Sequence, residues 1–205
     1  MKASELFYNK TQKNGFYNIM PIENIKSILT NGILSHNNAK KINHNSVAMQ
    51  EVQDIRENIK VPNGMYLHDY ANLYFDFGNP MMYKRRNQAE HLCILKISLE
   101  VFNLDGIVVS DRNASSLYAR FYTPSVGINM LDFDTIYMKN WNSGDFYLKL
   151  YYKSVKCAEI LVPNKVDSKY ITAACVINEI NRNKLIDVGF KEEIFVSKSN
   201  FFRRW

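Results

Sequence analysis

The apolar residues of this chain come in short runs, and this pattern restricts the fold more than any other feature. Runs of four to eight apolar residues between Gly, Pro, Asn or Asp are typical of buried strands. A membrane-spanning helix needs about 18 apolar residues in a row, and no run approaches that length. We therefore expect a soluble protein with no membrane partner, and we predict strands at Gly15–Met20, Leu92–Leu99, Ile107–Ser110, Cys157–Val162, Tyr170–Val176 and Glu193–Ser197.

Helical spacing occurs between these runs. After Pro21, apolar residues recur on one helical face as far as Gly32, which fits the end of that helix. Further helices are predicted at Val47–Asn58, inside a polar stretch, and at Ile177–Val188. Because strands and helices intermix without strict alternation, the expected class is α+β. The length of 205 residues and the even composition predict a single domain over residues 1–205.

Charge and cysteine content narrow the class of protein. The formal net charge of +6 would attract polyanions, although many proteins with such an excess have no polyanionic partner. Cys93, Cys157 and Cys175 are odd in number, widely spaced and set among apolar residues, so we expect buried thiols and no disulfide. The N-terminus lacks the apolar stretch of a secretory signal, and we expect a cytoplasmic location.

None of the common catalytic motifs is present. The chain lacks the glycine-rich phosphate loops, the paired-histidine zinc motif and the serine-hydrolase elbow. Its histidines, His36, His44, His68 and His91, lack the i, i+4 spacing of a helical metal pair, and no two carboxylates accompany them at a recognisable interval. We expect no metal cofactor.

Glu159 is an acidic residue inside an apolar run. Strand alternation allows Ala158 and Ile160 to face the core while Glu159 faces solvent, and the spacing alone favours this interpretation. The alternative is a functional site, because a buried carboxylate is costly unless it is paired.

Arg56 also has two interpretations. It lies on a predicted helix beside Asp54 and Glu57, which is typical of a solvated helix face. Its guanidinium would equally suit a pyrophosphate, through two parallel hydrogen bonds. The sequence pattern does not choose between these interpretations.

Aromatic and basic residues mix without a clear period in Asp132–Lys156, which makes this segment a poor core candidate. Aromatic rings stack on nucleic-acid bases and lysines pair with phosphates. An amphipathic surface over the core explains the same composition equally well. The residues concerned are Tyr137, Lys139, Trp141, Phe146, Tyr147, Lys149, Tyr151, Tyr152 and Lys153.

Several segments, taken in order, resemble the DarT family of toxin-type enzymes, which ADP-ribosylate DNA bases and are paired with a macrodomain antitoxin. The most specific part comprises Arg56, Val61–Pro62, Leu67–Tyr70, Tyr74–Phe75 and Pro80–Tyr83. The similarity extends to Phe16–Ile19, Val108–Ala114, Arg120–Tyr122, Ala158–Pro163, Ile194–Val196 and Phe201–Phe202.

This resemblance implies the ADP-ribosyltransferase fold, with two packed mixed sheets, an NAD⁺-binding cleft between them and flanking helices. It reverses the interpretation of Glu159, which becomes the catalytic carboxylate, with Arg56 as a second catalytic residue. NAD⁺ would be the co-substrate, in contact with Tyr17, Asn18, Met20, Gly32, Ile33, Arg56, Met81 and Tyr83. We assign nucleic-acid contacts to Asn113, Arg120, Lys139, Trp141, Tyr147 and Lys149.

The chain departs from the family pattern at two places. Asn18 stands where the family has a histidine, and an amide cannot take a proton near neutral pH. Gly78 and Asn79 precede Pro80 where the family commonly has Arg-Ser, so we expect the cleft rim to lack one cation. The sequence therefore does not identify the target base.

The expected acceptor is an unpaired base of DNA, because stacking side chains favour single strands over a duplex. The alternatives are RNA modified by the same chemistry and a non-catalytic nucleic-acid-binding module that inherited the fold; protein modification ranks lower. The expected setting is a toxin–antitoxin or anti-phage system, with a monomeric enzyme and an antitoxin of macrodomain or other type.

Overall fold

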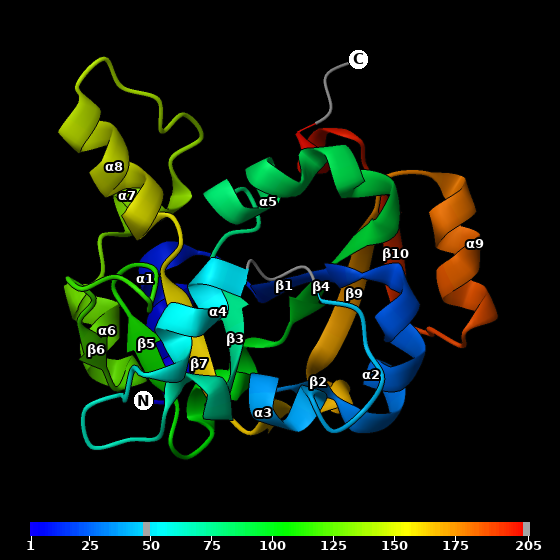
Figure 1. The fold of residues 1–205 in the computed structure, drawn as a ribbon, viewed down its shortest axis with the longest axis horizontal. Coiled ribbons are helices and arrows are strands. Elements are labelled where there is room, and N and C mark those ends of the chain that lie inside the picture. The colour runs from blue at the N-terminus through cyan, green and yellow to red at the C-terminus, as the bar shows by residue number, and fades with distance from the viewer. Residues whose placement is uncertain (47–49, 203–205) are drawn as a thin grey trace.

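The computed structural model describes residues 1–46 and 50–202 (Figure 1). Its strands are β1 (Phe16–Pro21), β2 (Ile33–Leu34), β3 (Tyr70–Tyr74), β4 (Leu92–Ile97), β5 (Val108–Ser110), β6 (Phe121–Tyr122), β7 (Glu159–Pro163), β8 (Lys165–Val166), β9 (Ile171–Val176) and β10 (Glu193–Val196). Its α-helices are α1 (Ala3–Thr11), α2 (Ile25–Asn31), α3 (His36–Ala39), α4 (Gln50–Glu57), α5 (Pro80–Arg85), α6 (Pro124–Met130), α7 (Phe133–Tyr137), α8 (Phe146–Val155) and α9 (Glu179–Asp187). Short 3₁₀ turns lie at Ile22–Asn24, Leu67–Asp69, Arg86–His91, Leu99–Asn103, Ser168–Tyr170 and Ser199–Phe201.

A mixed sheet forms the centre of the molecule. Eight strands follow the order β10-β9-β4-β1-β3-β7-β5-β6, and β2 pairs separately with β8. Neighbouring strands are antiparallel except β9 and β10, which are parallel. Figure 1 shows α9 beside β10 at one end of the sheet, and α1 and α6 near β5 and β6 at the other. The α+β class is confirmed.

The sheet is nearly divided between its central strands, β1 and β3. Among the described residues these strands are aligned at one pair, Tyr17 opposite Tyr74, whereas β1 pairs with β4 along its whole length. We expected two packed sheets. In the structure, the two halves belong to one eight-stranded sheet and are joined at this pair. Joining them covers part of two strand edges, which would otherwise expose unpaired N–H and C=O groups.

Phenylalanine side chains hold the two halves together. Phe16 of β1 and Phe75, which follows β3, meet with ring centroids 5.7 Å apart and planes at 90°. Phe7 of α1 packs on both rings, at 5.1 and 5.9 Å, and all three residues are almost fully buried. Burying a side chain of this size contributes about 1.5–3 kcal/mol. This core fixes the place where β1 and β3 meet.

Most of the predicted elements are present. The strands β1, β4, β5, β7, β9 and β10 and the helix α9 lie within two residues of the predicted bounds. Gly32 ends α2 as expected, with φ at +81°. The predicted Val47–Asn58 helix corresponds to α4, and its residues 47–49 lie outside the described part. All three cysteines are free and buried, as predicted.

The segment Asp132–Lys156, in which we found no clear period and assigned no helix or strand, contains α7 and α8. Each helix begins at an aspartate cap: Asp132 accepts a hydrogen bond from the Thr135 N–H, and Asp145 from the Leu148 N–H. Within residues 1–46 and 50–202, no helix combines the length and apolarity needed to cross a bilayer.

Candidate active site

Glu159 begins β7 in the middle of the sheet, opposite Tyr74 of β3 and Ser110 of β5. Alternation along β7 places Ile160 and Val162 in the main apolar core and Glu159 on the other face. That face lines a cavity of about 580 Å³, and only 1% of Glu159 is exposed. The solvated interpretation of Glu159 is therefore wrong.

Hydrogen bonds fix one oxygen of the Glu159 carboxylate. Its Oε1 accepts from Nη1 of Arg56 and from the main-chain N–H of Ala114, both at 3.0 Å. The Glu159 N–H donates to Oγ of Ser110 at 3.2 Å, and that hydroxyl donates to the Arg112 carbonyl at 2.7 Å. Oε2 has no hydrogen-bond partner among the described residues. One oxygen is anchored, and the other is free to meet a ligand.

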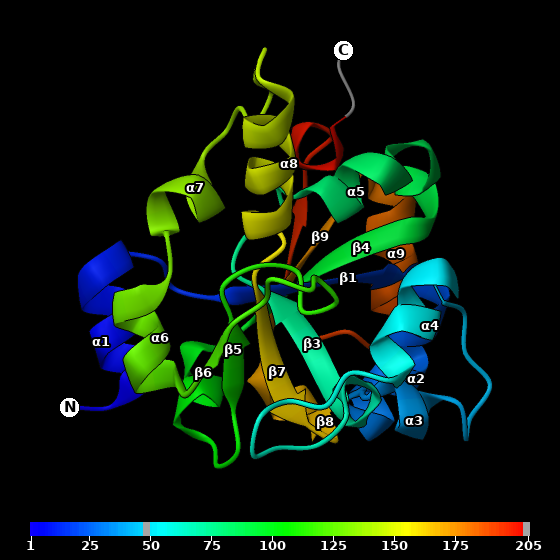
Figure 2. The same cartoon turned by 60° about the vertical axis from the view of Figure 1, so that its left-hand side comes forward.

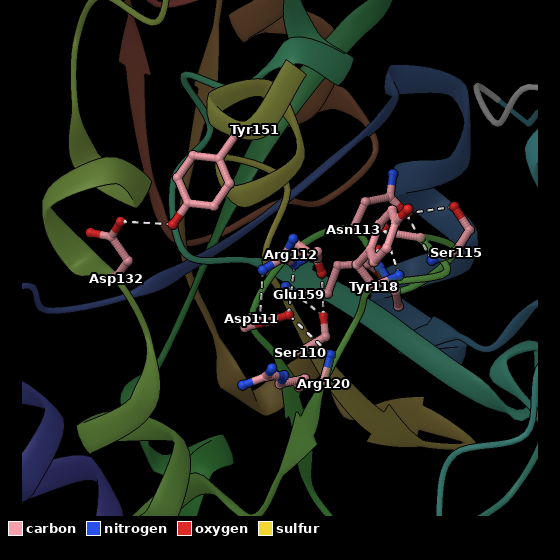
Figure 3. Close-up of polar contacts among 12 residues, drawn as sticks. Ser110, Asp111, Arg112, Asn113, Ser115, Tyr118, Arg120, Asp132, Tyr151 and Glu159 are labelled. Atoms are coloured by element: carbon pink, nitrogen blue, oxygen red, sulfur yellow. Dashed lines mark hydrogen bonds and ion pairs between the residues drawn. The ribbon is translucent and has the colours of Figure 1, made fainter. Parts of the chain in front are cut away.

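The loop between β5 and β6, residues 111–120, is held in place beside this carboxylate, as Figure 3 shows. The Asp111 carboxylate accepts two hydrogen bonds from the Arg112 guanidinium, at 3.1 and 3.2 Å. The Asn113 N–H donates to the Ser154 carbonyl at the end of α8, at 3.0 Å. These bonds position the loop main chain that contacts the carboxylate.

Arg56 reaches the cavity from α4. Its side chain is 9% exposed, whereas its neighbours Asp54 and Glu57 are exposed to solvent. Burial alone would lower the pKa of Arg56, but the facing Glu159 carboxylate reverses this effect and raises the pKa. The solvated-face interpretation is therefore wrong for Arg56, and the guanidinium is a permanent cation in the cavity wall.

The opposite wall comes from β1 and from the junction of α2 with β2. Asn18, Met20, Gly32 and Ile33, for which we predicted NAD⁺ contacts, all line the cavity. Nδ2 of Asn18 donates to the Asn72 carbonyl at 3.0 Å, and its Oδ1 is buried without a partner in the described chain. At Gly32 the positive φ favours glycine, and an added Cβ would lie 2.3 Å from the Val166 oxygen.

Three histidines to which we assigned no site role, His36, His44 and His68, also line the cavity. The rings of His36 and His68 lie 4.1 Å apart and are tilted by 34°. Burial, followed by the neighbouring His68, lowers the pKa of His36 to about 4. Burial and then Arg56 lower the pKa of His68, whose Nε2 has no partner among the described residues. Both rings are therefore neutral near pH 7.

Tyr74 is a further cavity residue without a predicted role. Burial, followed by the Glu159 carboxylate, raises its pKa, so the hydroxyl stays protonated. The register that places Tyr74 opposite Glu159 joins residues far apart in the sequence, and local patterns carry no signal for such a pairing.

The remaining predicted NAD⁺ contacts divide into two groups. Met81 of α5 lines the cavity, whereas Tyr17 and Tyr83 do not. Alternation along β1 turns Tyr17 away from Asn18, and its ring packs on Phe77 with centroids 4.9 Å apart. Tyr83 packs on Phe202 at 5.5 Å. The NAD⁺ contacts of these two tyrosines stay predictions, and both rings pack against aromatic neighbours outside the cavity lining.

The predicted nucleic-acid contacts are also dispersed. Asn113 lines the cavity, and Arg120, Lys139 and Tyr147 are exposed outside it. Lys149 is half-buried. Trp141 is half-buried too, and its ring packs on Tyr83 and Phe202 at 6.3 and 5.6 Å. Of the two aromatic residues predicted to contact nucleic acid, Tyr147 is exposed and Trp141 packs against other rings. Fewer aromatic side chains are therefore exposed for base stacking than the sequence suggests.

Three cations also line the cavity, Lys84, Arg85 and Lys153. Of these, the sequence indicated Lys153, as one of the basic residues of the segment 132–156 that could pair with phosphates. Asn79, at the departure from the family pattern, is fully buried and caps α5 by accepting a hydrogen bond from the Met82 N–H at 3.0 Å. Its role is therefore structural, and it does not line the cavity. Within the described residues, no group of three His, Cys, Asp or Glu side chains is arranged to hold a metal ion.

Residues 17–202 match the sequence model of a family described as DarT, ssDNA thymidine ADP-ribosyltransferase. The chain belongs to the DarT family. The resemblance drawn from the sequence segments is confirmed, and the match includes both Arg56 and Glu159. The fold agrees as well: a Thermus sp. 2.9 DarT in complex with ADP-ribosylated ssDNA superposes with a TM-score of 0.80 at 23% identity, over 92% of this chain and 96% of that one.

Two curated relatives of this DarT chain are similar in sequence. A DNA ADP-ribosyl transferase–DNA ADP-ribosyl glycohydrolase fusion protein of Thermosipho africanus is 32% identical over 171 residues, which is 78% of this chain. A DNA ADP-ribosyl transferase of Thermus sp. is 31% identical over 136 residues, which is 61% of this chain. The matched regions span 42% and 65% of the two relatives' own lengths.

Proposed function

We propose that this chain transfers ADP-ribose from NAD⁺ to a thymidine base of single-stranded DNA. The description of its family names this acceptor and this transfer, and the Thermus DarT with the same fold has been solved with NAD⁺ as well as with ADP-ribosylated ssDNA. The observation that carries the proposal is the Glu159 carboxylate, buried in the cavity wall with one oxygen fixed and the other without a partner in the described chain.

The cavity suits a polar dinucleotide. Ligand pockets commonly measure about 300–1,000 Å³, and this one measures about 580 Å³. Three of its residues, Asn18, His68 and Glu159, each have a buried polar atom with no partner among the described residues. Buried polar atoms are almost always hydrogen-bonded, so three unpaired ones in a single cavity support a ligand that pairs with them.

Glu159 stabilises the charge that the reaction creates. When the bond between nicotinamide and the ribose breaks, positive charge develops on the ribose, and a carboxylate beside it favours that state over the ground state. Arg56 and the Ala114 N–H already hold Oε1, so the carboxylate does not reorganise during the reaction. Other N–H groups of Arg56 suit phosphate oxygens, which guanidinium groups bind in pairs.

The same carboxylate serves the acceptor. A ring nitrogen of the base forms the new bond to the ribose C1′, nicotinamide leaves with the electrons of the old bond, and the nitrogen loses its proton. Oε2 of Glu159 accepts that proton as general base, since it lies free in the cavity.

Asn18 takes a simpler role than the family histidine. Because its Nδ2 is bonded to the Asn72 carbonyl, the group that remains for a ligand is the acceptor Oδ1. An acceptor suits the carboxamide N–H of nicotinamide or a ribose hydroxyl. We therefore propose that Asn18 orients the substrate and that Glu159 alone accepts the proton.

The test is transfer of label from NAD⁺ to matched DNA and RNA oligonucleotides, single-stranded and duplex, followed by mass spectrometry of the released nucleosides. We expect labelled thymidine from single-stranded DNA. Labelled ribonucleosides would establish the RNA alternative, and label that survives nuclease but not protease would establish protein modification. If none of these acceptors is labelled, the remaining alternative is a non-catalytic binding module. The buried pair of Arg56 and Glu159 argues against that alternative.

We further infer that the chain acts as a toxin and that a partner enzyme removes the modification it makes. The Thermosipho africanus relative carries a DNA ADP-ribosyl glycohydrolase in the same protein, and such an enzyme would remove the modification proposed for this chain. We propose a monomeric cytoplasmic toxin in an anti-phage system, paired with a macrodomain-type antitoxin. Growth arrest on expression, relieved by a co-expressed glycohydrolase, is the expected result; growth without arrest would contradict it.

A further inference from the structure

Lys156 is a buried lysine close to the candidate catalytic residue. It lies between the end of α8 and the start of β7, three positions before Glu159. Its side chain is 0% exposed, and it does not line the cavity. Lysines are almost never fully buried unless they are paired, so this position needs an explanation.

The ammonium of Lys156 uses three hydrogen bonds, the full number it can donate. Nζ donates to Oδ2 of Asp76 at 3.0 Å, to the Ile136 carbonyl at 2.9 Å and to the Met138 carbonyl at 2.8 Å. It also lies 5.1 Å from the centre of the Trp141 ring, within the range of a cation–π contact. These partners come from two separate stretches of the chain.

The first stretch leads from β3 to α5. Oδ1 of Asp76 accepts from the Gly78 N–H at 3.1 Å, and the Asp76 carbonyl accepts from Nδ2 of Asn79 at 2.8 Å. Asn79 in turn caps α5. Through Asp76 the ammonium is therefore connected to the start of the helix that brings Met81 into the cavity.

The second stretch leads from α7 towards α8. The Ile136 and Met138 carbonyls lie at the end of α7, and Trp141 packs against Tyr83 of α5 and against Phe202. Lys156 thus joins both ends of the segment 132–156 to α5. Figure 2 shows α8, which belongs to this segment, above the central strands of the sheet.

We propose that Lys156 is a positioning residue. Its buried ammonium fixes the segment 132–156 in place beside the cavity, so that an acceptor base reaches Glu159 in the orientation needed for transfer. The inference rests on the proposed function and adds the group that governs acceptor placement. A buried ion pair is often no more stabilising than an apolar pair, and three directional hydrogen bonds specify geometry in a way that apolar packing does not. Lys156 does not line the cavity, and saturating NAD⁺ offsets a weaker placement of Met81 on α5, so at saturating NAD⁺ cleavage with water as acceptor should not need Lys156.

The experiment separates these two reactions in the purified chain of 205 residues. Nicotinamide release without DNA measures hydrolysis, in which water bonds to the ribose C1′, nicotinamide leaves and a proton goes to solvent. Transfer to a single-stranded thymidine-containing oligonucleotide measures acceptor placement. The variants are Lys156→Met, which keeps the apolar stem, and Asp76→Asn, a milder change that removes the partner charge. Lys184→Met, at an exposed site on α9, is the control for the lysine-to-methionine exchange.

We expect Lys156→Met and Asp76→Asn to lower transfer roughly 10- to 100-fold, as small displacements of reacting groups do, while hydrolysis changes less than about twofold. Chymotrypsin should cut faster after Phe146 and Tyr147 in both variants, and Lys184→Met should match the parent in all assays. Equal loss of both reactions, no loss of transfer, or unchanged cleavage would overturn the proposal. If the parent neither hydrolyses NAD⁺ nor modifies DNA, the proposed function fails, and the protease rates still decide whether Lys156 fixes the segment.

Discussion

At the scale of single residues, the site depends on the opposite charges of Arg56 and Glu159, which are both almost fully buried in the cavity wall. Arg56 Nη1 and Glu159 Oε1 lie 3.0 Å apart, with side chains 9% and 2% exposed. Removing two charges from water is costly, and only close pairing with additional hydrogen bonds offsets that cost. Each residue is therefore required to keep the other in place.

Arg56→Ala should lower the free energy of unfolding by about 3 kcal/mol, because it leaves the buried Glu159 carboxylate without its cation. The matched control is Arg182→Ala on α9, whose guanidinium is half-exposed in a surface pair with Glu179. Its loss should cost less than about 1 kcal/mol. Urea denaturation of both variants measures the difference, and equal stabilities would show that the Arg56 pair contributes no more than a surface contact.

The stacked histidines predict a pH dependence of stability. The pKa of His36 in the folded protein is about 4, with burial first and then His68, Lys40, His44 and Arg56 as causes. Between about pH 4 and the ordinary value near 6.5, the unfolded chain binds more protons than the folded one, so stability falls as pH falls through this window. Urea denaturation should show a shallower fall for His36→Asn than for the parent, and identical slopes would refute this.

The interpretation of Glu159 shows the limit of local sequence patterns. Alternation correctly placed it on the face opposite Ile160. That face is covered by Arg56 from α4 and by Ala114 from the loop after β5, which are 103 and 45 positions away in the chain. Such long-range packing decides between solvent and cavity, and in the sequence only the family resemblance indicated it.

At the scale of elements, the apolar runs predicted strands well because most runs become buried strands in the sheet. The exception is β10, an edge strand that is mostly exposed. The helices α7 and α8 were missed because their aromatic residues do not follow one face: Phe146 and Tyr147 are 66% and 81% exposed. The available signals were the caps, Asp132 and Asp145, which are among the favoured residues at helix starts.

Tyr147→Ala tests whether α8 contacts the acceptor. Loss of one base-stacking contact costs about 1–3 kcal/mol, so we expect the KM for single-stranded DNA to rise roughly 5- to 100-fold, with the KM for NAD⁺ unchanged. Because Tyr147 is 81% exposed, the unfolding midpoint should not move. Phe195→Ala, at a half-exposed position on β10, is the control and should leave both constants unchanged. An unchanged KM for DNA in Tyr147→Ala would exclude this contact.

At the scale of the whole molecule, the cavity lies where β1 and β3 meet, at the one aligned pair that joins the halves of the central sheet. Residues of both strands, Asn18 and Met20 on one and Asn72 and Tyr74 on the other, line the cavity together with Glu159. The strand order that brings them together links distant parts of the chain, so composition and periodicity carry no information about it. The α+β class followed from local patterns, whereas the position of the cleft came only from the resemblance.

The most direct test of the account is Glu159→Gln, assayed for transfer from NAD⁺ to single-stranded DNA and for NAD⁺ binding by calorimetry. The variant should fold with a lower free energy of unfolding, since the amide oxygen still accepts hydrogen bonds from Arg56 and the Ala114 N–H while the Arg56 guanidinium loses its counter-charge. It should bind NAD⁺ within a few-fold of the parent. Transfer should fall by at least about 100-fold, because the charge that stabilises the ribose in the transition state is gone. Transfer at the parent's rate by the folded variant would contradict the account.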